Sequence, residues 1–85
     1  MLMTEKLKRI RVSLGLSQKG IAARLGDQDA RIRITRNSIS DYERGKRDPP
    51  SLVVLAYANL ADVSMNALID DAIEFPALLQ KSERE

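Results

Sequence analysis

Apolar residues recur every three or four positions in five stretches of the chain, a spacing that places them on one face of an amphipathic helix. The first stretch carries Met3, Leu7, Ile10 and Leu14. Thr4 offers an N-cap for this helix, and Gly15 stands just past its last apolar residue, where helices commonly end. The pattern therefore predicts a first helix that closes at Gly15.

Two further helices are predicted by the same reasoning. Ser17 caps the second helix and Gly26 ends it, whereas Thr35 caps the third and Gly45 closes it. The apolar faces consist of Ile21, Ala22 and Leu25 in the second helix and of Ile39 and Tyr42 in the third. Both helices are short.

Serines open the last two predicted helices. Ser51 follows the sequence DPP and caps the fourth helix, and Ser64 caps the fifth, which Pro76 separates from the end of the chain. Their apolar faces consist of Leu52, Leu55, Ala56 and Leu60 in the fourth helix and of Met65, Leu68 and Ile69 in the fifth. Five short helices predict an all-α domain over residues 1–75, with residues 76–85 as a tail.

The segment DQDARIRITR, residues 27–36, interrupts this helical pattern. It is charged at its start and then alternates Arg and Ile, which is compatible with a short strand but also with an ordered loop. We interpret it as a loop.

Composition limits the chemistry that is open to this chain. The 85 residues contain no cysteine and no histidine, which excludes disulfides, thiolate metal sites and the commonest general base. The sequence also has no glycine-rich phosphate loop and no paired carboxylates, so we expect neither an enzyme nor a cofactor. It has no apolar run that could span a bilayer and no secretory signal, and we expect a cytoplasmic protein.

Charge is distributed unevenly between the two halves. Residues 1–48 hold 12 Lys and Arg against 6 Asp and Glu, whereas residues 49–85 hold 2 against 6. The first half is therefore a candidate surface for a polyanion such as DNA, although scattered surface charge is the simpler explanation.

Three pieces of sequence carry a family resemblance, namely LKRIRVSLGLSQKGIAARLG, TRNSISDYERGKRDPPSL and LAYANLADVS. Together, over residues 5–71, they resemble the phage-repressor (Cro/CI-type, XRE) helix-turn-helix family. The resemblance implies a compact five-helix DNA-binding domain. One departure is the nine-residue separation of Gly26 from Thr35. The turn is then about seven residues longer than the family's usual one, which the fold should tolerate because each doubling of loop length costs only ~0.6 kcal/mol.

The predicted third helix corresponds to the family's recognition helix, whose outward residues near the N-terminus face the bases. These residues are Arg36, Asn37, Ser40 and Asp41. Arg pairs well with guanine, Asn with adenine, and Asp accepts from cytosine, which suits base readout. For Asp41 the alternative is a helix-surface pair with Arg44.

Other residues are expected to hold the DNA backbone, as basic loops and helix N-termini commonly do. The expected phosphate-binding residues are Gln18, Ser38, Arg44, Lys46 and Arg47, with Arg31 and Arg33 from the inserted loop. For Ser38 a packing role is the alternative, and for the basic residues it is a solvated surface. The resemblance further implies a structural ion pair between Arg11 and Glu43.

We expect a sequence-specific transcriptional regulator, acting as a repressor that binds double-stranded DNA as a homodimer on a palindromic operator. The dimer contact is expected near the fifth helix and the apolar residues Ile73, Phe75, Leu78 and Leu79, although these residues could also form a tail that folds back. The alternative function is a protein-interaction module, such as the antitoxin of a toxin pair, that binds a partner through its C-terminal segment.

Overall fold

The computed structural model describes residues 1–74, which contain five α-helices and no strand. The helices are α1 (Met3–Ser13), α2 (Gln18–Gln28), α3 (Arg36–Glu43), α4 (Ser51–Ala61) and α5 (Met65–Ile69). The predicted all-α, five-helix fold is thereby confirmed. The predicted tail 76–85 and the residues Phe75, Leu78 and Leu79 lie outside the described residues.

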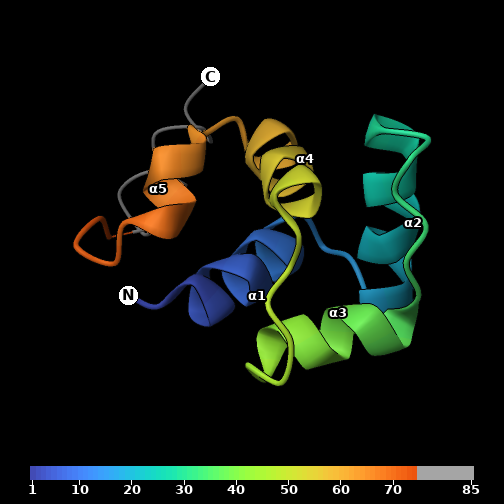
Figure 1. The fold of residues 1–85 in the computed structure, drawn as a ribbon, viewed down its shortest axis with the longest axis horizontal. Coiled ribbons are helices and arrows are strands. Elements are labelled where there is room, and N and C mark those ends of the chain that lie inside the picture. Colours follow the sequence, from blue (N-terminus) through green and yellow to red (C-terminus); the bar gives the residue numbers. More distant parts are fainter. Residues whose placement is uncertain (75–85) are drawn as a thin grey trace.

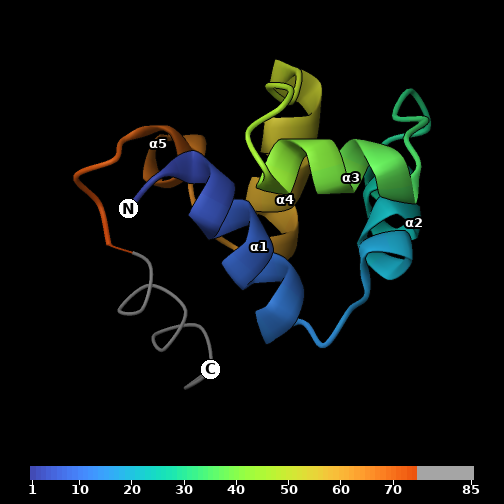
Figure 2. The same ribbon diagram turned by 90° about the horizontal axis from the view of Figure 1, so that it is seen from below.

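Helix α4 lies at the centre of the domain and packs against α1, α2 and α5 (Figure 1). Helix α3 packs against α1 and α2. In both views α5 lies at one end of the molecule and α2 at the other (Figures 1 and 2). The core consists of the inward residues of all five helices, including Leu7, Ile21, Ile39, Tyr57 and Leu68, which are at most 1% exposed.

The predicted face of α4 is partly wrong. Leu55 is 42% exposed, whereas Val53, Val54 and Tyr57 are buried. Because three helices surround α4, its buried surface is broader than a single stripe and is rotated away from Leu55. The three-to-four spacing of leucines therefore did not identify which side of α4 faces the core.

Two of the predicted N-caps are also wrong. Helix α1 begins at Met3, with Leu2 as its N-cap, and the Leu2 N–H donates to Glu5 Oε1 at 3.0 Å. Thr4 is therefore inside the helix, because Glu5 satisfies the backbone at its start. Helix α4 follows Pro50 as its N-cap, which makes Ser51 the first helical residue. Ser17 and Ser64 do cap α2 and α5, each accepting a backbone N–H with its hydroxyl.

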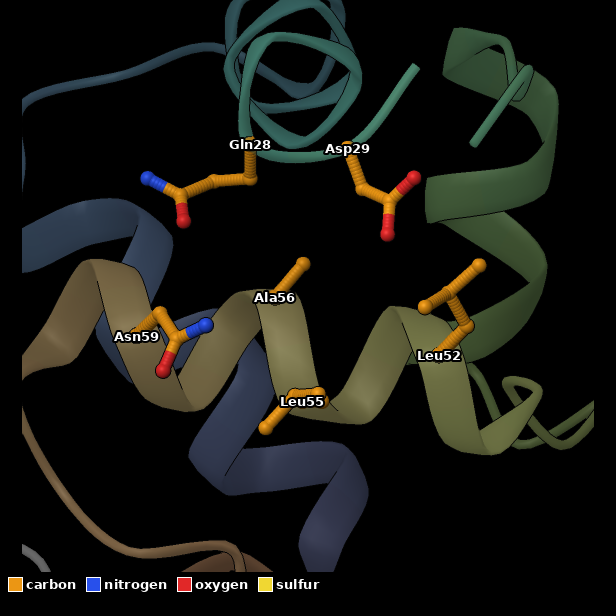
Figure 3. A pocket seen from close by; sticks show the side chains of 6 residues that line it. All are labelled: Gln28, Asp29, Leu52, Leu55, Ala56 and Asn59. Carbon is orange, nitrogen blue, oxygen red and sulfur yellow. The ribbon is translucent and has the colours of Figure 1, made fainter. Parts of the chain in front are cut away.

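Helix α2 continues past Gly26 to Gln28, so the predicted end at Gly26 is wrong. Gln28 and Asp29 extend from this last turn toward α4 (Figure 3). From there the chain returns along α2 to the start of α3 (Figure 1). The insertion therefore adds two helical residues to α2 and a return loop over residues 29–35, which contains no strand.

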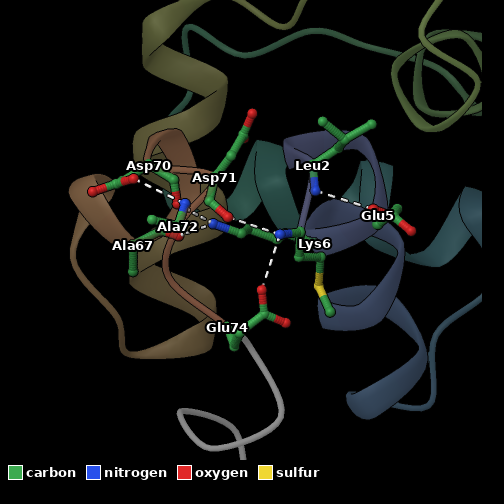
Figure 4. A network of polar contacts seen from close by, with 9 residues as sticks. Leu2, Glu5, Lys6, Ala67, Asp70, Asp71, Ala72 and Glu74 are labelled. Carbon is green, nitrogen blue, oxygen red and sulfur yellow. Dashed lines mark hydrogen bonds and ion pairs between the residues drawn. The ribbon is translucent and has the colours of Figure 1, made fainter.

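Lys6 is a charged residue of the core that the apolar pattern does not indicate. It lies on the inner face of α1 and is 0% exposed. Its Nζ donates to the carbonyl oxygens of Ala67 at 2.6 Å and Asp70 at 2.7 Å, so it reaches from α1 to the end of α5 (Figure 4). A cation is favourable there because the last carbonyl groups of a helix carry partial negative charge.

Candidate nucleic-acid interface

Helix α3 has one buried face and one exposed face. Ile39 and Tyr42 are 0% and 1% exposed and hold the helix against α1 and α2. Thr35 precedes it in an extended conformation as the N-cap, and its N–H donates to Ser38 Oγ at 3.4 Å. At the other end, Gly45 adopts a φ of +75°, a left-handed conformation that suits glycine and ends the helix.

The four residues that we expect to read bases share the outer side of α3. Arg36 and Asn37 are exposed, and Ser40 and Asp41 are half-buried. Within residues 1–74 the ion pairs are Met1 with Glu74, Arg11 with Glu43 and Asp29 with Arg31. The alternative pairing of Asp41 with Arg44 is therefore not formed in the structure.

Three cations follow α3 in a turn that its last residues organise. Arg44, Lys46 and Arg47 are all exposed. The Asp41 carbonyl accepts the N–H groups of Lys46 at 2.9 Å and Arg47 at 3.4 Å. The Arg47 guanidinium lies over the Tyr42 ring, 5.7 Å from its centroid, where a cation–π attraction helps to hold it. The turn is thus an ordered basic surface directly beside α3.

Glu43 joins the first three helices at the end of α3. Arg11 of α1 donates from Nε to Glu43 Oε2 at 2.7 Å and from Nη2 to Oε1 at 3.1 Å, and Gln18 of α2 donates from Nε2 to Oε1 at 3.3 Å. Arg11 also donates to the Leu16 carbonyl, at the entry to α2. The hydrogen bond to Glu43 raises the pKa of Arg11. The structure thus contains the ion pair that the resemblance implied.

Tyr57 is a residue of this region that the sequence did not single out. It is fully buried in α4, and among the described residues its hydroxyl has no hydrogen-bond partner. Burial, together with the nearby charge of Glu43, raises its pKa. Its phenol therefore stays neutral in the neighbourhood of the Arg11–Glu43 pair.

The return loop has an internal anchor and an internal ion pair. Ile32 is 6% exposed and belongs to the core, whereas Arg31 and Arg33 on either side of it are exposed. Arg31 pairs with Asp29, with a distance of 2.7 Å between Nη2 and Oδ2. Arg33 makes no ion pair with any residue in the range 1–74. We expected both loop arginines to bind phosphate, but within the described part of the chain Arg31 is paired with a carboxylate and Arg33 is not.

Comparison with known proteins places this geometry in a family. A family model described as helix-turn-helix matches residues 7–68, most of the chain. Neither the curated proteins nor the solved structures include one that matches this chain. None of the helices described is long and apolar enough to cross a membrane, and residues 1–74 contain no cluster of acidic side chains that could hold a metal ion. The chain belongs to the helix-turn-helix family of the Cro/CI (XRE) type, a family of DNA-binding regulators and not of enzymes.

Proposed function

We propose that this protein is a transcriptional repressor that binds a palindromic operator as a homodimer, with α3 in the major groove. The observation that carries the proposal is the division of α3 into a buried inner face and an outer face. The outer face presents Arg36 and Asn37 in the first helical turn. In helix-turn-helix complexes the N-terminal residues of the second helix of the motif contact the base edges.

In this proposal the base-reading residues are Arg36, Asn37, Ser40 and Asp41. Arg36 and Asn37 are fully available at the surface, so each can make a bidentate contact, to guanine and adenine respectively. The half-buried Asp41 has no ion-pair partner within residues 1–74, so its carboxylate can accept from a cytosine amino group.

The phosphate contacts are assigned to the surfaces that flank α3. Arg44, Lys46 and Arg47 form the basic turn after α3, and Arg33 is exposed in the return loop before it. The side-chain amide of Gln18 already donates one N–H to Glu43, and its oxygen is an acceptor that cannot donate to a phosphate. We therefore assign its phosphate contact to the second N–H of the same amide group. Ser38 accepts the Thr35 N–H, so its own hydroxyl hydrogen remains for a phosphate.

Dimerisation completes the proposal because a single small module covers little DNA, and two-fold dimers read half-sites about one helical turn apart. We place the dimer contact at α5 and the segment after it, the end of the domain opposite to α2 (Figure 2). The DNA-binding domain then comprises residues 1–75 and acts on DNA in the cytoplasm. A second proposal is that the apolar C-terminal segment, residues 72–85, binds a protein partner; residues 75–85 of this segment lie outside the described residues.

The test is selection from a randomised pool of DNA duplexes at several salt concentrations. The wild-type protein is expected to enrich a palindrome. Arg36→Ala and Asn37→Ala are each expected to lose about 1–3 kcal/mol of discrimination at particular bases, because each removes one bidentate contact. Arg9→Ala is the matched control, since it removes an exposed arginine of α1. It should leave the preferred sequence unchanged.

Two results would contradict the proposal. One is a pool that enriches no sequence while binding stays steeply salt-dependent, which would make the basic half a non-specific polyanion surface. In that case the next step is to test whether the C-terminal segment binds a protein partner. The other is a palindrome whose bases are read equally well by both α3 variants.

A further inference from the structure

Asp29 lies at the junction of α2 and the return loop. Its N–H donates to the Leu25 carbonyl at 3.3 Å as the C-cap of α2. Its own carbonyl accepts the Ile32 N–H at 2.9 Å, which closes a tight turn. Its side chain is 23% exposed and extends toward α4 on the side of Leu52 (Figure 3). The backbone that carries this carboxylate is therefore hydrogen-bonded on both sides.

This carboxylate receives three hydrogen bonds from one arginine. The Arg31 backbone N–H and Nε donate to Oδ1 at 2.9 and 3.0 Å, and Nη2 donates to Oδ2 at 2.7 Å. Surface ion pairs usually contribute little, and a two-pronged arginine–carboxylate geometry such as this one is the main exception. Arg31 lowers the pKa of the Asp29 carboxyl to about 2. The carboxylate is therefore ionised, and engaged by Arg31, at every pH at which the protein would bind DNA.

The pair lies in the return loop that leads into the base-reading end of α3. Arg31 precedes the first residue of α3 by five positions and Arg33 by three. An extended chain spans at most ~3.6 Å per residue, so both lie within ~20 Å of Arg36, a distance that covers only a few phosphates of a DNA strand.

We propose that Asp29 restrains DNA binding by occupying Arg31, so that the return loop offers the DNA backbone one net cation, Arg33, instead of two. This inference rests on the proposed function. The Asp29–Arg31 pair has no net charge, so bringing it to the DNA releases no counterion. If Arg31 turned to a phosphate instead, it would leave an unpaired carboxylate beside a polyanion. Asp29 thereby lowers the sequence-independent part of the affinity and leaves the contribution of α3 unchanged.

The test compares the salt dependence of duplex binding by the wild-type protein and Asp29→Asn. Asparagine keeps the size of the side chain and an oxygen for the Arg31 N–H but loses the charge that holds the guanidinium. The variant is expected to gain about one phosphate contact, which steepens the slope of log K against log salt by ~0.9. Its affinity should then fall about threefold more than that of the wild type between roughly 50 and 200 mM salt.

Asp27→Asn is the matched control. It removes the same charge two residues earlier, from an exposed residue of α2 that is not among the ion pairs of residues 1–74. Its slope should stay close to that of the wild type. Equal slopes for the two variants would overturn the proposal, because the effect would then be one of overall charge.

A double variant tests whether Arg31 is held by Asp29 or contacts a phosphate in the wild-type complex. Asp29→Asn with Arg31→Gln should bind with the wild-type slope, because both members of a neutral pair are removed. A lower slope than that of the wild type would overturn the proposal, since Arg31 would then contact phosphate in the wild-type complex.

The pair can also be tested without DNA by following the Asp29 carboxyl by NMR during a pH titration. A pKa of about 2 is expected, with a return to about 3.8 in Arg31→Gln. A value near 3.8 in the wild type would overturn the proposal independently.

Failure of the proposed function can be told apart from failure of this inference. If the wild type binds no duplex, both proposals fall, whereas a bound palindrome with an unchanged slope in Asp29→Asn overturns this one alone.

Discussion

Individual polar residues connect helices of this domain in addition to the apolar core. Glu43 ties α1 and α2 to the end of α3, with a side chain that is 5% exposed. Lys6 ties α1 to the end of α5. Removing one partner from such a buried group leaves the other without its hydrogen bonds, which costs more than the intact interaction contributes.

At this scale we predict that Lys6→Met destabilises the domain. Methionine fits the apolar part of the site but leaves the buried Ala67 carbonyl and the part-buried Asp70 carbonyl without the Nζ donor. We expect a loss of about 1–3 kcal/mol in the free energy of unfolding, measured by urea denaturation. Lys8→Met, at an exposed position of the same helix, should change it by less than about 0.5 kcal/mol. Equal stabilities of the two variants would contradict a structural role for the Lys6 ammonium group.

The sequence could indicate the Arg11–Glu43 pair only through the family resemblance, and it could not indicate Lys6. The position of Lys6 next to Leu7 is compatible with either face of α1, and only the packing of α5 decides it. Contacts between residues 61 or 64 positions apart, as between Lys6 and α5, depend on the assembled core. Local patterns carry no information about them.

At the scale of elements, glycine shows where sequence interpretation succeeded and failed. Gly15 and Gly45 adopt positive φ and end α1 and α3 as predicted, but Gly26 has no positive φ and lies inside α2. A glycine permits a helix end without requiring one. The helix continues for two more residues before the return loop begins, and that loop is the part of the chain that departs from the family pattern.

We predict that the return loop is part of the core and not a mobile insertion. Ile32→Ala removes a side chain that is 6% exposed and should cost about 2–4 kcal/mol of unfolding free energy, measured by thermal or urea denaturation. Ile69→Ala is the matched control, because Ile69 is 58% exposed and the same change there should cost less than about 0.5 kcal/mol. A mobile loop would be indicated if Ile32→Ala were equally mild.

At the scale of the whole molecule, the fold gathers the basic first half of the chain around α3. The basic turn and the return loop flank α3, and α5 lies at the far end of the domain (Figures 1 and 2). The uneven charge of the sequence thus has a spatial counterpart in residues 1–74. The five helices were predictable from periodicity and resemblance, whereas two of the N-caps, the pairing of Arg31 and the exposure of an Arg33 unpaired among the described residues required the folded chain.

The central claim is that DNA binds at α3 and the surfaces on either side of it. The most direct measurement is the change in backbone amide NMR shifts when a selected duplex is added to the uniformly labelled protein. We predict the largest changes at residues 33–41 and 44–47 and at the start of α2, with little change in α5. Large changes confined to α5 or to the exposed side of α1, with α3 unaffected, would contradict the claim.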